Sequence, residues 1–234
     1  MARDAPARVT PDAGGLGCAT KRPVTASNLR PDGSRYTYLD LVQNVSDAVR
    51  DAVMRAGVAP ALESLAGWEF AGTNTGAITD LVGIRKFRKG FYVGAPRVPH
   101  GPQPFVQGYN VVVAQDGIGK PHVAVPSEAH AKRHGFYRVH AVDPASADNV
   151  YPNALLLDYG LGRNGIEPSG FLRDYLVQVY ADDADLLLGR AFVALAGARI
   201  HGGYFVLSRS RAFDFAANED ASLEHRGRHH RPAP

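Results

Sequence analysis

The chain has 234 residues, of which 45% are hydrophobic and 21% charged, a balance typical of a globular protein with a buried core. Its formal net charge is +3, but residues 1–35 carry three net positive charges and residues 221–234 carry two, which leaves −2 for the body between them. A slightly acidic body with basic ends argues against nucleic-acid binding, which concentrates positive charge on one folded face.

The single cysteine, Cys18, excludes an internal disulfide and a metal site built from several cysteines. No apolar segment of the kind found in a signal peptide precedes it, and no stretch approaches the ~18 consecutive apolar residues of a membrane span. We therefore expect a cytoplasmic protein without a membrane span and without a bound metal.

Residues 1–35 are rich in Pro, Gly, Ala, Asp and Arg without periodicity, so we expect a flexible N-terminal arm. The first ordered element should be a helix at 41–56, where apolar residues recur at three-and-four spacing. Thr37 and Asp40 have the spacing of a capping box, and Gly57 is a plausible stop. This helix should cover one end or one edge of a sheet.

From Trp68 onward the pattern changes to period two with frequent turn signals. No further helix of useful length separates these segments, which argues against a parallel βαβ fold. Several candidate strands run to about ten residues, as the tilted strands of a barrel do. The candidate strands are 68–72, 84–93, 105–114, 136–142, 154–160, 171–181, 185–196 and 200–209.

We therefore predict an all-β fold with an N-terminal helix: an antiparallel lipocalin-like barrel of roughly eight strands. It should form a single domain at 36–215, followed by a disordered basic tail at 216–234.

Several sequence blocks resemble the GXWXG/DUF4334-type family of lipocalin-like (calycin) proteins. They are 67–72 (GWEFAG), 83–91, 155–160, 172–179 with 185–190, and 203–209. Ala66 and Phe70 stand where the motif around Trp68 would have glycines. The resemblance implies a lipocalin-like barrel that binds an apolar small molecule, and it implies no particular reaction.

Arg173 shares one strand face with Tyr175 and Val177, and we predict that this face points into the barrel. A buried guanidinium needs a partner, and Asp158 on the preceding strand is the natural candidate. Two roles remain open for these residues: a pair that braces the strands at one barrel end, or contact with a ligand as catalytic groups.

Basic residues occur on both faces of the candidate strand at 84–93. A solvated face explains most of them, but Lys86 or Lys89 could project inward toward an anionic or carbonyl group, where desolvation would lower the pKa of the ammonium. Lys86 is the third candidate catalytic residue.

Aromatic side chains are the candidate ligand contacts, because a tyrosine places a hydroxyl at the end of an apolar ring and can orient one polar ligand atom. For each of them, packing in the core is the alternative role. The candidates are Trp68, Tyr109, Tyr137, Tyr159, Tyr175 and Tyr204.

Known catalytic motifs are missing: the sequence has no Gly-x-Ser-x-Gly and no His-Glu-x-x-His. Residues 160–165 match a dinucleotide fingerprint by letters, but a strand follows them, so we expect a hairpin loop. No cofactor is expected.

Three functions remain open, with the oligomeric state undetermined. The first is binding of a small, largely apolar molecule inside the barrel. The second is a cofactor-free isomerase, cyclase or lyase acting in the same pocket. The third, weaker one is an interaction module that uses the basic arm and tail. An enzyme should have a pocket ionisable group that lacks a structural partner and has a perturbed pKa, whereas a carrier should have every inward charge paired.

Overall fold

The structure is a computed structural model that describes residues 26–76, 83–94, 105–143, 145, 149–162, 164, 168–195, 198–213 and 215. Most of the predicted arm (1–25) and the whole predicted tail (216–234) lie outside the described residues. The described part of the arm, 26–35, forms a turn against the barrel, with the Asn28 amide donating to the Val179 carbonyl at 2.8 Å.

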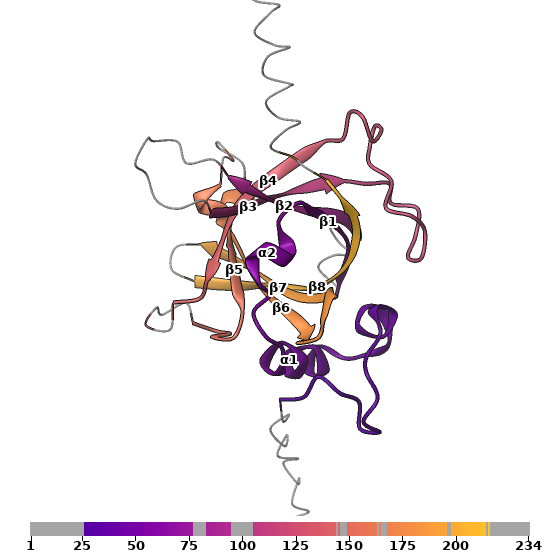
Figure 1. Ribbon diagram of the computed structural model, residues 1–234, viewed down its shortest axis with the longest axis vertical. Coiled ribbons are helices and arrows are strands. Elements are labelled where there is room, and N and C mark those ends of the chain that lie inside the picture. The colour runs from indigo at the N-terminus through magenta and orange to yellow at the C-terminus, as the bar shows by residue number, and fades with distance from the viewer. Residues whose placement is uncertain are drawn as a thin grey trace, which may run out of the picture.

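The strands form one closed barrel in which each strand pairs antiparallel with its neighbours in the chain, and the first pairs with the last (Figure 1). All eight predicted strands are present, so the predicted antiparallel lipocalin-like barrel is confirmed. The strands are β1 (Trp68–Thr75), β2 (Lys86–Gly94), β3 (Phe105–Val112), β4 (Arg133–Ala141), β5 (Leu155–Asp158), β6 (Leu172–Tyr180), β7 (Asp183–Leu195) and β8 (Ala198–Ala212).

The predicted helix at 41–56 is divided in two. A short π-helical segment, η1 (Asp40–Asn44), is followed by an extended residue, Val45, and then by α1 (Asp47–Ala56). The division falls at Ser46, whose hydroxyl accepts the Val49 N–H and so begins a new helix. The capping hydrogen bonds between Thr37 and Asp40 and the end of α1 at Gly57 are as predicted.

Helix α1 lies against the outer wall of the barrel over β6 and β7 (Figure 1). Its buried residues Val53 and Met54 join a core layer with Val177 and Val206 from the strands. None of the described helices is long and apolar enough to cross a membrane.

One end of the barrel is filled by a short helix that the sequence did not reveal, α2 (Leu62–Leu65). Figure 1 shows α2 inside the ring of strands. Leu65 is fully buried and packs in the interior core with Phe70 and Phe91. The end where β1 begins is therefore plugged by α2, while α1 flanks the barrel.

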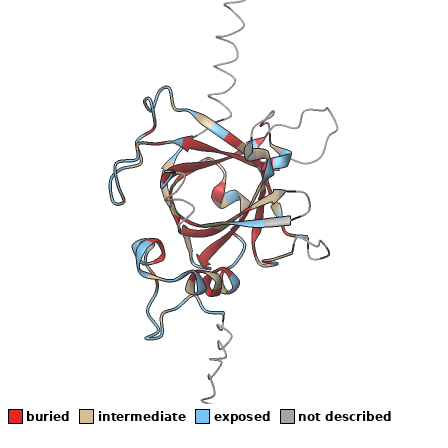
Figure 2. Cartoon of the chain, turned by 180° about the vertical axis from the view of Figure 1, so that it is seen from behind, coloured by how far each residue is buried: buried red, intermediate tan, exposed pale blue. Residues whose placement is uncertain are grey.

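The outer face of the sheet at β1–β3 is also buried. Glu69 is 0% exposed on this face and accepts hydrogen bonds from Tyr109 (2.9 Å) and Arg211 (2.8 Å), with Arg88 at 3.3 Å. Glu128, from the segment between β3 and β4, forms ion pairs with both arginines: its Oε2 lies 2.8 Å from Arg88 Nη2 and 2.9 Å from Arg211 Nη1. Figure 2 shows the strands largely buried. Because both faces are covered, apolar alternation alone does not reveal which face is interior.

Candidate functional site

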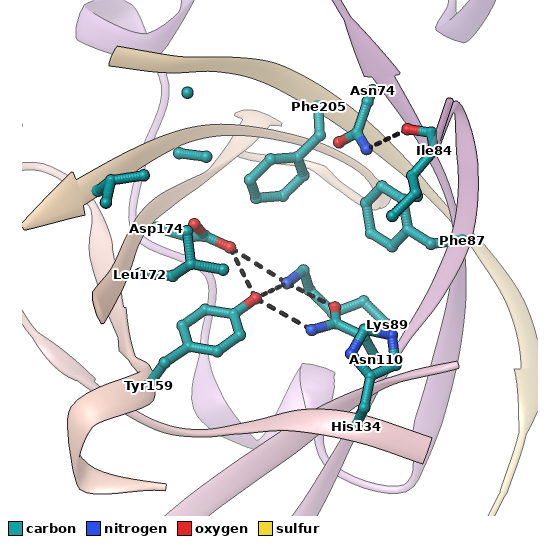
Figure 3. Close-up of a pocket in the computed structure, with 13 residues that line it drawn as sticks. Asn74, Ile84, Phe87, Lys89, Asn110, His134, Tyr159, Leu172, Asp174 and Phe205 are labelled. Atoms are coloured by element: carbon teal, nitrogen blue, oxygen red, sulfur yellow. Dashed lines mark hydrogen bonds and ion pairs between the residues drawn. The ribbon is translucent and has the colours of Figure 1, made fainter. Parts of the chain in front are cut away.

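A cavity of about 300 Å³ lies in the barrel interior, and Figure 3 shows the residues that line it. Its lining residues place it at the end opposite α2. It lies where β1, β3 and β7 end and where β2, β4, β6 and β8 begin. Its apolar wall is formed by Ile84, Phe87, Leu172, Ala191, Val193 and Phe205, and its polar groups are Asn74, Lys89, Asn110, His134, Tyr159 and Asp174.

A buried polar cluster lies on the cavity wall, formed by Lys89, Asn110, Tyr159 and Asp174 from four different parts of the barrel (Figure 3). The Lys89 ammonium donates to the Tyr159 hydroxyl at 2.6 Å, to Asn110 Oδ1 at 3.0 Å and to Asp174 Oδ2 at 3.2 Å. The Tyr159 hydroxyl donates to Asp174 Oδ2 at 2.9 Å and accepts from Asn110 Nδ2 at 3.2 Å. Lys89 is 1% exposed and Asp174 4%, so this ion pair is shielded from water.

Burial sets the electrostatics of the cluster. It lowers the pKa of Lys89 because a desolvated ammonium is unfavourable, and the Asp174 carboxylate opposes this shift. Burial and the same carboxylate raise the pKa of Tyr159 well above its ordinary value, so its hydroxyl keeps its proton. Asp174 Oδ1 is buried and has no hydrogen-bond partner among the described residues. One acceptor of the cluster is thus left unused.

Aromatic rings surround the lysine. Its Nζ lies 4.7 Å from the ring centroid of Tyr137, 5.1 Å from that of Phe205 and 5.6 Å from that of Phe87. Their faces favour a cation by about 0.5–2 kcal/mol each, which partly offsets the desolvation of the ammonium.

Two glycines, Gly72 and Gly189, leave the space that the rings of Phe87 and Phe205 occupy. A Cβ at Gly72 would lie 2.5 Å from the Phe87 ring, and one at Gly189 would lie 2.0 Å from the Phe205 ring. Both rings line the cavity, so these glycines help to define its walls.

The prediction that Arg173 points into the barrel is wrong. Arg173 lies on the outer face with Tyr175 and Val177, which belong to the core layer beneath α1. The pairing with Asp158 is present, at 3.0 Å between Nη1 and Oδ1, but it lies outside the cavity. The inward charge on β6 belongs to the next residue, Asp174.

Asp158 nevertheless bears on the site through the backbone. Its carboxylate accepts the N–H groups of Gly160 and Leu161 and so caps η2 (Tyr159–Leu161). Tyr159 is the first residue of this turn. The Arg173–Asp158 pair therefore braces the turn that carries the cavity tyrosine.

Lys86, the third candidate, lies on the outer side of β2. It is buried, but its ammonium donates to Asp116 at 2.6 Å and to the carbonyls of Lys120 and Pro121. The inward lysine is Lys89, which shares a strand face with Phe87.

Of the six aromatic candidates, Tyr159 lines the cavity. Tyr137 is also interior, but its hydroxyl donates to the Gly90 carbonyl and it packs beside Tyr159. Trp68 lies toward the α2 end, stacked under the Arg209 guanidinium at 4.5 Å. The remaining three, Tyr109, Tyr175 and Tyr204, lie in the two outer core layers.

Asp174, Asn110, Asn74 and His134 are cavity polar groups absent from the predicted site, whereas Lys89 was predicted as the alternative to Lys86 for an inward lysine. A sequence signal existed for Lys89, which has Phe87 and Phe91 two residues to either side. None existed for Asp174, because Leu172 and Leu176 flank it just as Phe171 and Tyr175 flank Arg173. A charged residue within an apolar strand face is a stronger indication of an interior site than a charged residue at a strand edge.

Within the described ranges, no group of three or more His, Cys, Asp or Glu side chains is arranged to hold a metal ion.

Residues 160–162 belong to the connection between the antiparallel neighbours β5 and β6, as predicted for a hairpin loop. Gly165 lies outside the described residues.

Lys89 and Tyr159 donate all their N–H and O–H protons within the cluster, so the open group that the cluster offers is the acceptor Asp174 Oδ1.

The chain matches none of the protein-family models with which it was compared, and no curated protein matches its sequence. The closed eight-stranded antiparallel barrel is consistent with a lipocalin-like fold.

Proposed function

We propose that the barrel binds a small, largely apolar molecule that carries one polar group, with that group held at Lys89, Tyr159 and Asp174. The observation that carries this proposal is the buried polar cluster set into an otherwise apolar cavity wall. Binding sites for small molecules are typically apolar, with a few placed polar groups that fix orientation. A hydroxyl suits the cluster because it can donate to the unpaired Asp174 Oδ1, and a carbonyl oxygen can replace one of the three acceptors that Lys89 uses.

The size of the cavity favours a compact ligand. Its volume of about 300 Å³ is at the low end of the roughly 300–1,000 Å³ found for ligand pockets. Eight-stranded barrels are just wide enough to enclose one small ligand. Such binding also agrees with what the resemblance to the GXWXG/DUF4334-type proteins implies.

A second candidate function is cofactor-free catalysis by an isomerase, cyclase or lyase. It is favoured by Asp174 Oδ1, which has no hydrogen-bond partner in the described part of the chain, and by the lowered pKa of Lys89. These are features of a site prepared for proton transfer rather than of a carrier in which every inward charge is satisfied.

Binding can be tested with 1-anilinonaphthalene-8-sulfonate, whose fluorescence rises in apolar surroundings. We expect saturable binding to the wild-type protein and a loss of affinity in Ala191→Leu, which places a larger side chain in the cavity. The matched control is Ala212→Leu, at an exposed position near the other end of the barrel. Equal affinity in both variants and the wild type would contradict binding in this cavity.

Native mass spectrometry of protein purified from its own source provides a second test. A co-purified molecule lost in Ala191→Leu and retained in Ala212→Leu is the expected result. Its mass would identify the ligand class directly.

A further inference from the structure

We propose that Lys89 is a carbonyl-reactive amine, whose Nζ condenses with an aldehyde or ketone in the cavity to form an imine. This inference rests on the proposed function, because it requires the cavity to admit a small molecule. It names the ligand's polar group as a carbonyl and makes its capture covalent.

The identity of the buried cation is the first argument. The chain has 21 arginines and only five lysines, yet the only Lys or Arg that lines the cavity in the described part of the chain is a lysine. Arginine remains charged at all ordinary pH values, whereas lysine can lose its proton and become a nucleophile. A purely structural ion pair with Asp174 has no need of that property.

The surroundings of the two buried lysines are the second argument. Lys86 and Lys89 each donate to three oxygen atoms, but Lys86 lies on the outer side of β2 and does not line this cavity. Lys89 lies on a cavity wall among aromatic rings, and burial lowers the pKa of its ammonium. A desolvated lysine in an apolar pocket is the form in which this residue attacks carbonyl carbons.

The arrangement of proton carriers is the third argument. The Tyr159 hydroxyl lies 2.6 Å from Lys89 Nζ and 2.9 Å from Asp174 Oδ2, so it connects the nitrogen to the carboxylate. The ammonium proton can therefore pass to Asp174, which leaves a neutral amine beside a neutral acid. Asn110 Oδ1, at 3.0 Å, accepts one remaining N–H of that amine and orients it.

The reaction balances with these groups alone. The Nζ lone pair forms a bond to the carbonyl carbon, and the carbonyl π electrons move to oxygen, which takes a proton from Tyr159 as Asp174 replaces it. The Asp174 carboxylate then removes one proton from the nitrogen and returns it to the new hydroxyl, which leaves as water as the C=N bond forms.

The product is a protonated imine beside the Asp174 carboxylate. The cavity thus holds one cation and one carboxylate before and after the reaction, so no uncompensated charge is buried.

Reductive trapping tests the inference with benzaldehyde as the probe and sodium cyanoborohydride as the reductant, on the full-length protein near pH 7. We expect one benzyl group per chain by intact mass, located on Lys89 by peptide mapping. Lys120 and Lys132, which are exposed, should react several-fold more slowly. Adducts that appear on these two lysines while Lys89 stays unmodified would overturn the proposal.

Variants separate this inference from the proposed function. Lys89→Arg removes the nucleophile and should lose the adduct, whereas Lys86→Arg, at a lysine that does not line the cavity, should keep both the adduct and the binding of 1-anilinonaphthalene-8-sulfonate. Asp174→Asn should slow trapping. Dye binding without any Lys89 adduct would refute the imine and leave the binding site intact, whereas absence of dye binding by the wild type would count against the proposed function itself. Peptide mapping of the wild-type protein decides the question even if a variant fails to fold.

Discussion

Arg173 and Asp174 are neighbours in the chain, yet they lie on opposite faces of the barrel wall. Arg173 pairs with Asp158 on the outside at 3.0 Å, whereas Asp174 pairs with Lys89 inside at 3.2 Å. The two ion pairs differ in their surroundings: the outer pair is partly exposed and the inner pair is shielded from water. This difference predicts unequal effects when either pair is broken.

Removal of Lys89 alone should be strongly destabilising. Lys89→Met leaves the Asp174 carboxylate buried without its cation, and breaking a buried pair in this way costs about 3–5 kcal/mol. The double variant Lys89→Met/Asp174→Leu should recover most of that loss, because two apolar side chains replace two charges. Urea unfolding of the wild type, both single variants and the double variant measures the coupling. If the losses in the free energy of unfolding of the two single variants add up to that of the double variant, Lys89 and Asp174 do not stabilise each other.

The pH dependence of stability should report the charge on Lys89. Its pKa is lowered in the folded protein, whereas in the unfolded chain it is about 10.4. Between these two values the unfolded chain binds more protons, so the free energy of unfolding rises with pH. Below the folded pKa both states are protonated and the slope disappears.

The measurement compares the wild type with Lys89→Met/Asp174→Asn between about pH 7 and about pH 9.5, below the range in which tyrosines titrate. The wild type should gain stability relative to the variant as the pH increases. Parallel curves would mean that Lys89 keeps its ordinary pKa.

Removal of the outer ion pair should have a small effect. Arg173→Met breaks a pair whose side chains are 26% and 14% exposed, so we expect a loss of no more than about 1 kcal/mol. Dye affinity should stay within about twofold, because Arg173 does not line the cavity. Asp158→Ala should cost more, about 1–2 kcal/mol, since it also removes the cap of the turn that carries Tyr159. A loss of binding in Arg173→Met larger than that in Ala191→Leu would restore Arg173 as a ligand contact.

Glu69→Gln should destabilise the protein without changing the cavity. Glu69 is fully buried on the outer face and accepts hydrogen bonds from Tyr109 and Arg211. Among the described residues, loss of its charge leaves Arg88 and Arg211 with Glu128 as their remaining acidic partner. We expect a cost of about 3 kcal/mol. Thermal unfolding and dye titration of the same variant separate the two effects. A changed dye affinity in the folded variant would link this outer network to the cavity.

The positions of the strands could be predicted from the sequence, because turn signals separate most of them and residues alternate along them. Which face of each strand points into the barrel could not be predicted. Tyr175 and Val177 are as apolar as the interior residues beside them, because α1 covers their side of the sheet. A position that packs under a helix has the same composition as one that packs inside the barrel. Because Arg173 shares a face with Tyr175 and Val177, the alternation along the strand predicted Arg173 inside and Asp174 outside. Their true positions are the reverse.

The site was predictable only in part. Tyr159 lies two residues after the apolar segment 155–157, and a ring that ends in a hydroxyl suits a largely apolar pocket. Asn110 and His134 were not predicted, because nothing in their local sequence shows that they line the cavity. In the structure, Asn110 and Asp174 both accept hydrogen bonds from Lys89. The break at Ser46 was not predicted, because the apolar periodicity continues through it and favours one long helix.

Pairing of β1 with β8 joins Trp68 to Ala212, the beginning of the barrel to its end. During synthesis the seam cannot form until almost the whole barrel has left the ribosome, and contacts this distant in sequence are slow to form. Until then Lys89 and Asp174, 85 residues apart, belong to an open sheet whose inner face is exposed to water. The growing chain therefore has no closed cavity while it is on the ribosome. Any molecule that the barrel holds must enter after the last strand has been translated.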